Sequence, residues 1–396
     1  MRRLLLGIGG GAGFTLPPEA SFAITAASEG GWGGNHANPT YYNGKTYFAY
    51  VDGTAGDVVV ASYNHSTEAV VQTVLHAALS DDMVHAEPTL LVRASDHKIL
   101  VCYTGFDTGH CYLRISTSAE DVSSFAAEVD LDAQLSGGVY LYPHLMQLDN
   151  GTIYLFLRRD VGPGVPAIDG APWGYATSTD GGATWSALTT FFVETGAFAG
   201  YIEASKTSGT RIDFTATSIP SGSTPPASLY HAYFDGTFHK TDGTALSLPF
   251  DTADMTLVWS AVADSAISSI VRVVLDAGSP VILVVGTYGG ANHVRYATYS
   301  GSWSSAEILS DFTGGLALID GTSAVIGQVV GGVTQVFRYS ALDVSMITEQ
   351  LTSGTDHSFR AIPVIDAASD LKYLWLEGSS TGTVGNTTCR TMGYGT

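Results

Sequence analysis

Charged side chains are scarce in this sequence, and basic ones are the scarcest. Only 14% of the 396 residues are charged, and 17 basic residues against 37 acidic ones give a net charge of −20. A chain this acidic repels nucleic acids and anionic membranes, so we expect neither as a partner. Ser, Thr, Asn, Gly and Tyr must therefore make the surface polar. Such a composition is typical of secreted or virion-borne β-proteins, and we expect an extracellular or virion-associated location.

Cysteines and long apolar segments are also few. The three cysteines, Cys102, Cys111 and Cys389, cannot all pair, and we expect free buried thiols rather than a disulfide framework. Beyond the N-terminus, no stretch reaches the about 18 apolar residues of a membrane-spanning helix. Zinc-ligand spacings and Gly-rich phosphate loops are absent, so we expect no metal and no cofactor.

Residues 1–20 differ from the rest of the chain. A basic pair and an apolar run resemble a signal peptide, but the run contains glycines and no clear small-x-small cleavage site follows. Two interpretations stay open. The segment is either a weak signal-like sequence or a Gly-rich arm that contacts a virion component or another copy of the chain.

Residues 21–396 carry a repeated β-unit. Helical periodicity is nearly absent, and apolar runs of strand length alternate with Gly, Asn, Asp and Ser. The unit is an apolar strand, a turn and a second aromatic or β-branched strand, and its seven copies begin at Pro39, Pro88, Pro143, Tyr201, Ile270, Leu316 and Pro363. Repeats of about 50 residues with several strands each predict a β-propeller. We therefore expect an all-β, seven-bladed β-propeller over residues 21–396, with the segment Ser21–Ala27 completing the last blade.

A short motif supports this fold. The sequence STDGGATW, Ser178–Trp185, fits the Asp-box pattern S-x-D-x-G-x-x-W. Its Asp and Gly residues form a tight turn between the outer strands of a blade, and its Trp packs between blades. The motif indicates a propeller and does not indicate an activity.

Unusual polar residues stand near the points where the innermost strands would begin. In a propeller, the loops that lead into these strands form a pocket on one face, so recurrent His and Tyr there predict a binding site. A single such residue is more often structural, and only the recurrence favours a site. The candidates are Asn35, His36, His85, Tyr142, His144, Tyr201, Tyr230, His231 and His293. Arg158 and Arg159 end a strand, and one of them would face the pocket, because neighbours on a strand point to opposite sides.

These residue types suit a carbohydrate. Tyr offers a flat ring and a hydroxyl, His exchanges a proton near neutral pH, and Arg binds a carboxylate through two parallel hydrogen bonds. Paired carboxylates for glycoside hydrolysis are not evident, since Glu87 and Glu203 have no clear partner in the sequence.

Four stretches resemble the BNR-repeat propellers that include ulvan lyases. They are HAEPTLLV…ILVCYTG, YPHLMQLDNGTIYLFLRR with STDGGATW, YIEASKTSGTRIDF, and SLYHAYFDGTFHKTDGT. Ulvan lyases cleave a sulfated uronate polysaccharide by β-elimination. The resemblance implies a catalytic centre of His85, Tyr142 and Arg158, with Tyr201 as a further pocket residue. Arg158 would neutralise the uronate carboxylate, and Tyr142 and His85 would transfer protons.

The sequence departs from the family at one catalytic position. The family's second His follows a strand in a YSGH-like motif, which reads YTGF here with Phe106 at that place, and His110 is a candidate replacement. Two functions stay open. The first is a polysaccharide-binding propeller that cleaves a uronate-containing glycan by β-elimination, and the second is a non-catalytic propeller that binds a glycan or receptor in a phage virion or tail.

Overall fold

The structure is a computed structural model of the chain. It describes residues 19–23, 38–52, 55–79, 88–105, 109–160, 171–195, 199–219, 228–260, 266–267, 273–288, 291–310, 317–320, 323–330, 332–340, 347–350, 357–365, 373–378 and 388–392.

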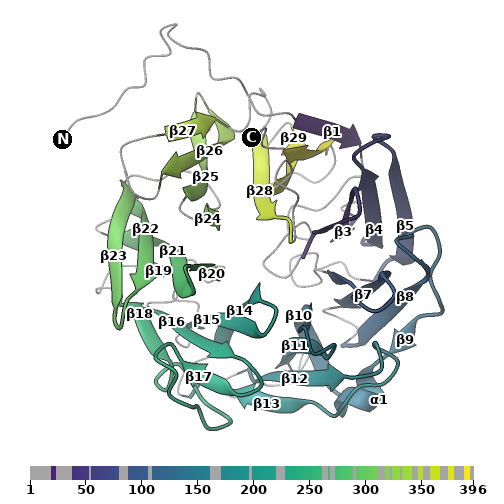
Figure 1. Ribbon diagram of the computed structural model, residues 1–396, viewed down its shortest axis with the longest axis horizontal. Coiled ribbons are helices and arrows are strands. Elements are labelled where there is room, and N and C mark those ends of the chain that lie inside the picture. The colour runs from purple at the N-terminus through teal and green to yellow at the C-terminus, as the bar shows by residue number, and fades with distance from the viewer. Residues whose placement is uncertain are drawn as a thin grey trace, which may run out of the picture.

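The described strands form seven antiparallel sheets of four or five strands each, set side by side around a common centre (Figure 1). The first sheet contains β2 (Thr40–Tyr42), β3 (Lys45–Val51), β4 (Val58–Asn64) and β5 (Val70–His76). The second contains β6 (Thr89–Val92), β7 (Lys98–Thr104), β8 (Cys111–Ala119) and β9 (Val129–Asp130), followed by the short helix α1 (Asp132–Leu135). The third contains β10 (Val139–Gln147), β11 (Ile153–Asp160), β12 (Trp173–Ser178) and β13 (Thr189–Phe192).

The remaining sheets follow in chain order. The fourth contains β14 (Ala199–Ser208), β15 (Arg211–Ile219), β16 (Ser228–Phe234), β17 (Phe238–Lys240) and β18 (Thr256–Ser260). The fifth contains β19 (Ala266–Ile267), β20 (Val273–Asp276), β21 (Ser279–Tyr288), β22 (Ala291–Tyr299) and β23 (Trp303–Ser310). The sixth contains β24 (Ala317–Asp320), β25 (Ser323–Val330), β26 (Val333–Ser340) and β27 (Ile347–Gln350). The last contains β28 (His357–Pro363), β29 (Tyr373–Gly378) and β30 (Thr388–Met392), joined by β1 (Glu19–Ala23).

The two ends of the chain meet in this last sheet. Strand β1 pairs with β30 in antiparallel register, from Glu19 opposite Met392 to Ala23 opposite Thr388. The expectation that Ser21–Ala27 completes the last sheet is confirmed for Ser21–Ala23, and residues 24–27 lie outside the described residues. The N-terminal strand therefore occupies the outer edge of the sheet, beside β30 (Figure 1).

The middle strands are buried on both faces because neighbouring sheets cover them. In β3, every residue from Thr46 to Val51 is buried, and the sequence of that strand is a nearly continuous apolar run. Such a run is expected of a strand whose two faces are both covered. Between the third and fourth sheets the filling is aromatic, and the rings of Phe191 and Phe238 stack with centroids 4.8 Å apart.

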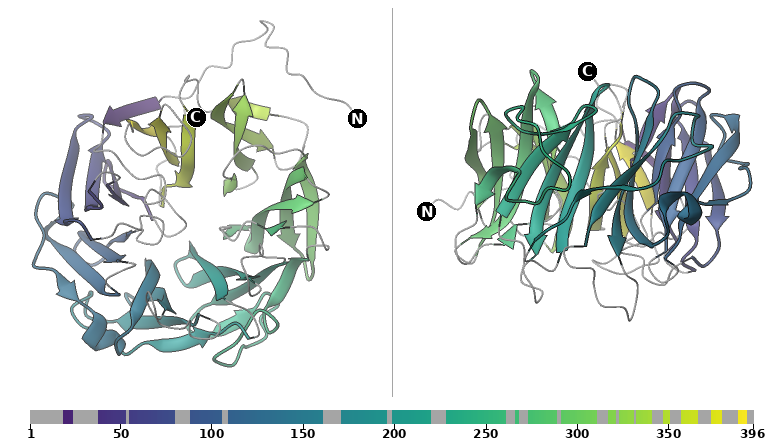
Figure 2. Two further views of the ribbon diagram at one scale, coloured as in Figure 1. Left: turned by 180° about the vertical axis from the view of Figure 1, so that it is seen from behind. Right: turned by 90° about the horizontal axis from the view of Figure 1, so that it is seen from below.

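The ring has two faces that differ in their connections. The strands run roughly along the axis of the ring, as the side view of Figure 2 shows. In the first four sheets, the innermost strand turns back into the second strand at residues 43–44, 93–97, 148–152 and 209–210. We call the side of these turns the hairpin face. We call the other side, where the innermost strands begin, the loop face.

The segment Ser178–Trp185 forms a hydrogen-bonded turn on the hairpin face, between β12 and β13. The Asp180 carboxylate accepts hydrogen bonds from the backbone N–H of Thr184 at 2.9 Å and from the Ser178 hydroxyl at 2.8 Å. These bonds hold the pKa of Asp180 down to about 2, with the hydroxyl and backbone of Thr184 as the main causes. Trp185 is buried in a cluster with residues of the second and third sheets.

Cys102 and Cys111 are buried free thiols on the neighbouring strands β7 and β8, with their Sγ atoms 3.6 Å apart. The expectation of free thiols is confirmed for these two residues. Within the described part of the chain, no helix has the length and apolar character needed to cross a membrane.

Deleting residues 1–23 should destabilise the ring, because the deletion removes the five backbone pairs between β1 and β30 and turns β30 into an exposed edge. We expect a lower melting temperature by differential scanning fluorimetry, with about 1–2 °C lost per kcal/mol for a chain of 396 residues. Deleting residues 1–18 keeps β1 and is the matched control. Equal melting temperatures for the two deletions would show that the pairing contributes no stability.

Candidate functional site

A β-bulge in the innermost strand of the third sheet places Tyr142. The register between β10 and β11 shifts between Leu141 and His144, so that Tyr142 and Pro143 together oppose one residue of β11. Tyr142 has φ +55°, which is uncommon for a residue with a side chain. Pro143 donates no backbone hydrogen bond, and it is tolerated here because β10 is an edge strand. Bulges often redirect a side chain next to a functional site.

The redirected ring lies against a buried arginine. The guanidinium carbon of Arg158 is 4.8 Å from the centre of the Tyr142 ring and 5.0 Å from the centre of the Tyr201 ring. The two rings are 5.8 Å apart, and Arg158 is only 5% exposed. Arg158 is near the end of β11, and the tyrosines are near the beginnings of β10 and β14, so all three lie toward the loop face. We call these three residues the Tyr–Arg cluster.

Trp173 fixes the geometry of this cluster. Its fully buried ring stacks on Tyr142 at 6.2 Å with an interplanar angle of 15°. Its indole N–H donates a hydrogen bond of 3.0 Å to the carbonyl oxygen of Gly200, the residue before Tyr201. A side chain at position 200 would clash with the ring of Phe192, since its Cβ would lie 2.3 Å from a ring carbon. Trp173 therefore ties the third sheet to the fourth beside both tyrosines.

The structure thus brings together three residues that the sequence singled out. Arg158 contacts Tyr142 and Tyr201, so it is the arginine of the pair that faces the predicted site. The alternation of side chains along the strand does not by itself decide between Arg158 and Arg159. His144 lies on the same strand as Tyr142, is fully buried and packs against Trp173 at 5.9 Å. The predicted site residues Asn35, His36 and His85, and the departing residue Phe106, lie outside the described residues.

Other predicted residues lie away from the innermost strands. Tyr230 and His231 are on β16 and His293 is on β22, each the third strand outward in its sheet. His231 is fully buried, which prevents direct contact with a soluble glycan in this structure. The stretch SLYHAYFDG predicts a strand but does not reveal its position in the sheet, and the structure shows that it forms a third strand rather than the approach to a first one.

His231 belongs to a buried hydrogen-bond network instead. Its Nε2 is 2.9 Å from a carboxylate oxygen of Asp213, and its Nδ1 is 2.9 Å from the hydroxyl of Thr241. Arg211 donates two hydrogen bonds to the same carboxylate, at 2.8 and 2.6 Å. Burial opposes ionisation of Asp213, but hydrogen bonds from His231 and Arg211 outweigh it and hold its pKa below the ordinary value. Burial also lowers the pKa of His231, despite Asp213.

His110 lies on the loop face of the second sheet, at the beginning of β8. Its Nδ1 is 3.0 Å from a carboxylate oxygen of Asp130 and 2.8 Å from one of Asp132. Burial, together with the negative charge of Asp130, raises the pKa of Asp132. One His nitrogen and two carboxylate oxygens within 4.8 Å of one another are a donor set that could hold a divalent cation. The same contacts form a local ion-pair network without one.

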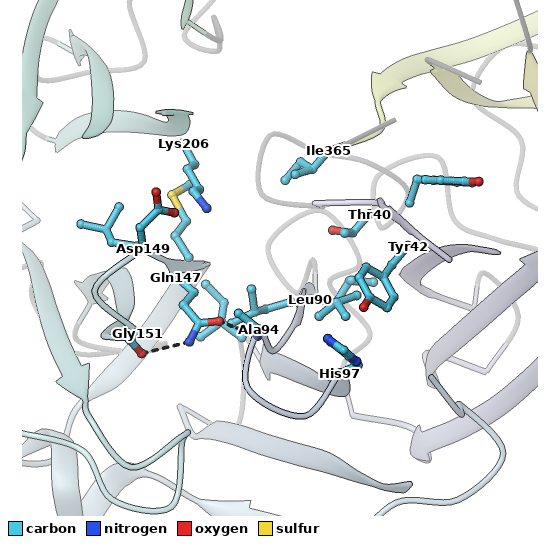
Figure 3. A pocket seen from close by; sticks show the side chains of 16 residues that line it. Thr40, Tyr42, Leu90, Ala94, His97, Gln147, Asp149, Gly151, Lys206 and Ile365 are labelled. Atoms are coloured by element: carbon cyan, nitrogen blue, oxygen red, sulfur yellow. Dashed lines mark hydrogen bonds between the residues drawn. The ribbon is translucent and has the colours of Figure 1, made fainter. Parts of the chain in front are cut away.

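A pocket of about 460 Å³ opens on the hairpin face, at the opposite end of β10 from Tyr142. It is lined by residues of the first four sheets and of the last (Figure 3). The rings of Tyr42 and His97 lie 4.6 Å apart on one side, and Lys206 and Asp149 lie on the other. The Gln147 side chain lies at the base of the pocket. Its amide oxygen accepts a hydrogen bond from the Ala94 N–H, and its amide nitrogen donates one to the Gly151 carbonyl. A second cavity of about 670 Å³ adjoins it toward the Ser178–Trp185 turn.

Sequence reasoning missed this pocket. His97 lies in a polar turn, where a histidine is ordinarily a surface residue, and Lys206 lies near the end of β14. Only the convergence of several sheets shows that their turns share one cavity.

Antiparallel sheets set around a centre, with polar clusters at the ends of the innermost strands, define an all-β protein of propeller architecture. The model of the family described as "BNR repeat-containing family member" matches residues 45–310, more than half of the chain, and the chain belongs to this family. Among the curated proteins no match is found.

Two solved structures support the architecture. A polysaccharide lyase of family PL25, an ulvan lyase bound to -[GlcA(1-4)Rha3S]-, is 19% identical with a TM-score of 0.73, and the match covers 96% of each chain. The polysaccharide lyase Uly1 is 13% identical with a TM-score of 0.69, over 96% of this chain and 99% of that one. At these identities the likeness shows the fold.

The His231 network generates a pH prediction. A folded pKa below the ordinary value of 6.5 means that the unfolded chain takes up a proton that the folded chain does not, so stability falls as the pH drops below about 6.5. His231→Gln removes this titration and should flatten the dependence. The measurement is the urea midpoint at about pH 7.5 and about pH 5 for both proteins. An equally steep loss of stability at low pH in the His231→Gln variant would show that His231 does not cause the pH dependence.

Proposed function

We propose that the protein binds a uronate-containing polysaccharide at the loop face and cleaves it by β-elimination. The observation that carries the proposal is the placement of Arg158 against the rings of both Tyr142 and Tyr201, which lie on the innermost strands of two neighbouring sheets. The sequence resemblance points to the same residues, and the solved relatives with the same fold are polysaccharide lyases. We further infer that each of the seven sheets is one blade.

The chemistry assigns a role to each member of the cluster. A base removes the proton beside the uronate carboxylate, the electron pair forms a carbon–carbon double bond, and the glycosidic C–O bond breaks as an acid protonates the leaving oxygen. Arg158 stabilises the negative charge that spreads onto the carboxylate, through charge-assisted hydrogen bonds. Tyr142 and His85 transfer the protons, and Tyr201 supplies a ring against which the sugar stacks.

Burial strengthens the contribution of the arginine. A positive charge that is almost out of contact with water interacts with a substrate carboxylate more strongly than an exposed one does. Trp173 and the β-bulge hold the tyrosine rings in place before substrate binds. Preorganisation of this kind lowers the barrier because no rearrangement is needed during the reaction.

A non-catalytic propeller that binds a glycan or a receptor is the second candidate. The observation in its favour is Phe106, which replaces the second His of the lyase motif. A secreted or virion-borne location suits both functions and belongs to the proposal.

The test is an assay for the unsaturated uronate product, which absorbs ultraviolet light, on a panel of uronate-containing polysaccharides. We expect Tyr142→Phe to lower kcat/KM by about 10²–10⁴ through loss of proton transfer. Arg158→Lys should lower it by about 10²–10³, because Lys lacks the planar fork.

The matched control is Tyr233→Phe. Tyr233 also lies under an arginine, with the Arg211 guanidinium carbon 3.9 Å from its ring centre, but it is on the third strand of its sheet. This variant should keep full activity. Glycan binding without any product would establish the non-catalytic function, and full activity in Tyr142→Phe would refute the assigned site.

A further inference from the structure

An aromatic groove lies at the outer circumference of the ring, between the fourth and fifth sheets. It has a volume of about 560 Å³ and runs between β18 and the turn that joins β22 to β23. Figure 1 places β18 and β23 side by side at the outside of the ring, whereas β10 and β14, which carry the tyrosines of the Tyr–Arg cluster, lie near its centre. The lining residues are Asp242, Thr256, Leu257, Val258, Trp259, Ser260, Tyr299, Gly301, Ser302, Trp303 and Ser305. We call it the Trp259–Trp303 groove.

Three half-buried aromatic rings give the groove its surface. Tyr299 and Trp303 have ring centroids 5.5 Å apart at an angle of 58°, and Trp259 lines the groove from β18. A bulge in the pairing of β18 with β16 falls between Trp259 and Leu257. It leaves Leu257 47% exposed, while the extra residue, Val258, is buried in the core. An irregularity in the strand thus presents apolar side chains outward instead of burying them.

The groove is rigidly supported from behind. The indole N–H of Trp303 donates a hydrogen bond of 3.3 Å to the hydroxyl of Thr241, which also bonds His231. The His231 ring meets the edge of Trp303 at 5.5 Å, and its other nitrogen bonds Asp213. A neutral His231 that carries its proton on Nε2 lets every donor in this network face an acceptor. The Trp303 indole donates to the Thr241 hydroxyl, which donates to Nδ1 of His231. Nε2 of His231 then donates to the Asp213 carboxylate. The buried network therefore holds Trp303 in one orientation, and this gives the network a role beyond the stability of the sheet.

The charge of the lining residues bears on which ligands the groove can bind. Asp242 is the one charged side chain among its lining residues. Hydrogen bonds from Thr244 hold the pKa of Asp242 below its usual value, so it is an ionised acceptor at neutral pH. Among the described residues that line the groove there is no cation to attract a phosphate, a sulfate or an acidic peptide. The guanidinium carbon of Arg295, which is not one of the lining residues, lies 5.7 Å from the centre of the Trp259 ring. Flat rings with hydroxyls and one carboxylate match the C–H face and the hydroxyl groups of a sugar ring.

We propose that the Trp259–Trp303 groove is a second carbohydrate-binding site, which holds uncharged sugar units of a polysaccharide by stacking on its aromatic rings. The identity of that polysaccharide rests on the proposed function; the existence of the site does not. A polymer bound at the circumference stays close to the Tyr–Arg cluster, so the groove raises the local concentration of cleavable chain.

The first experiment measures binding in proteins that cannot cleave. In the Tyr142→Phe background, Trp259→Ala and Tyr299→Ala should each raise the Kd for the polysaccharide by about fivefold to tenfold, measured by affinity electrophoresis. Trp259→Phe keeps a stacking ring and should restore most of the affinity. Equal Kd values for Trp259→Ala, Trp259→Phe and the parent would overturn the proposal.

The second experiment separates this site from the catalytic one. With an otherwise native chain, Trp259→Ala should raise KM for the long polysaccharide and leave kcat unchanged, and it should leave kcat/KM for short oligosaccharides unchanged. An equal loss on short and long substrates would overturn the proposal, because it would mean that the substitution acts on the Tyr–Arg cluster.

Binding at the Trp259–Trp303 groove can be tested independently of cleavage. If no uronate polysaccharide is cleaved, the quenching of tryptophan fluorescence by a panel of neutral polysaccharides still tests the groove. Quenching lost in Trp259→Ala and kept in Trp259→Phe supports the site. A dimer in light scattering that Trp259→Ala dissociates, without any glycan effect, would identify the groove as a contact between two copies and overturn the proposal.

Discussion

The fold depends on sheets that are apolar on both faces and therefore cannot stand alone. Strands such as β3 and β7 are buried along almost their whole length, and a single four-stranded sheet leaves such strands exposed to water. Stacking sheets against one another covers both faces of each. The innermost and outermost strands remain as edges, and two of the irregularities in the β-pairing fall there. The Tyr–Arg cluster and the Trp259–Trp303 groove both lie at such irregular edges.

An edge strand tolerates changes that a middle strand cannot. β10 accepts both a proline and a residue with φ +55° because no further strand pairs with its inner side. The resulting bulge shifts the alternation of side chains, so that Tyr142 comes to lie over Arg158 of the next strand. Trp173 then compensates for the irregular backbone by stacking on Tyr142 and bonding across to Gly200. The irregular backbone at Tyr142 and the Trp173 contacts that stabilise it therefore both lie at the Tyr–Arg cluster.

The sequence predicted the repeated strands well, because turn residues and apolar runs are short-range signals that the fold preserves. It also placed Tyr142 and Tyr201 near one another, since both stand near the start of the first strand of a repeat, and the family resemblance added Arg158 from the end of a second strand. It did not place Tyr230 and His231, because a strand pattern does not reveal the position of a strand within its sheet. It gave no sign of the pocket around His97, which only the convergence of several turns creates.

The strongly acidic composition does not oppose binding of an acidic glycan at the cluster. Repulsion between the surface and a polyanion acts through water and is screened beyond about 8 Å at physiological ionic strength. Arg158 acts at contact distance, nearly out of water and against two aromatic rings, where screening by salt is weak. The acidic surface therefore affects mainly the rate of encounter, which rises with salt, and the cluster determines the strength and orientation of binding. In the proposed arrangement the aromatic groove, whose described lining residues include no cation, holds the uncharged parts of a chain whose charged units reach Arg158.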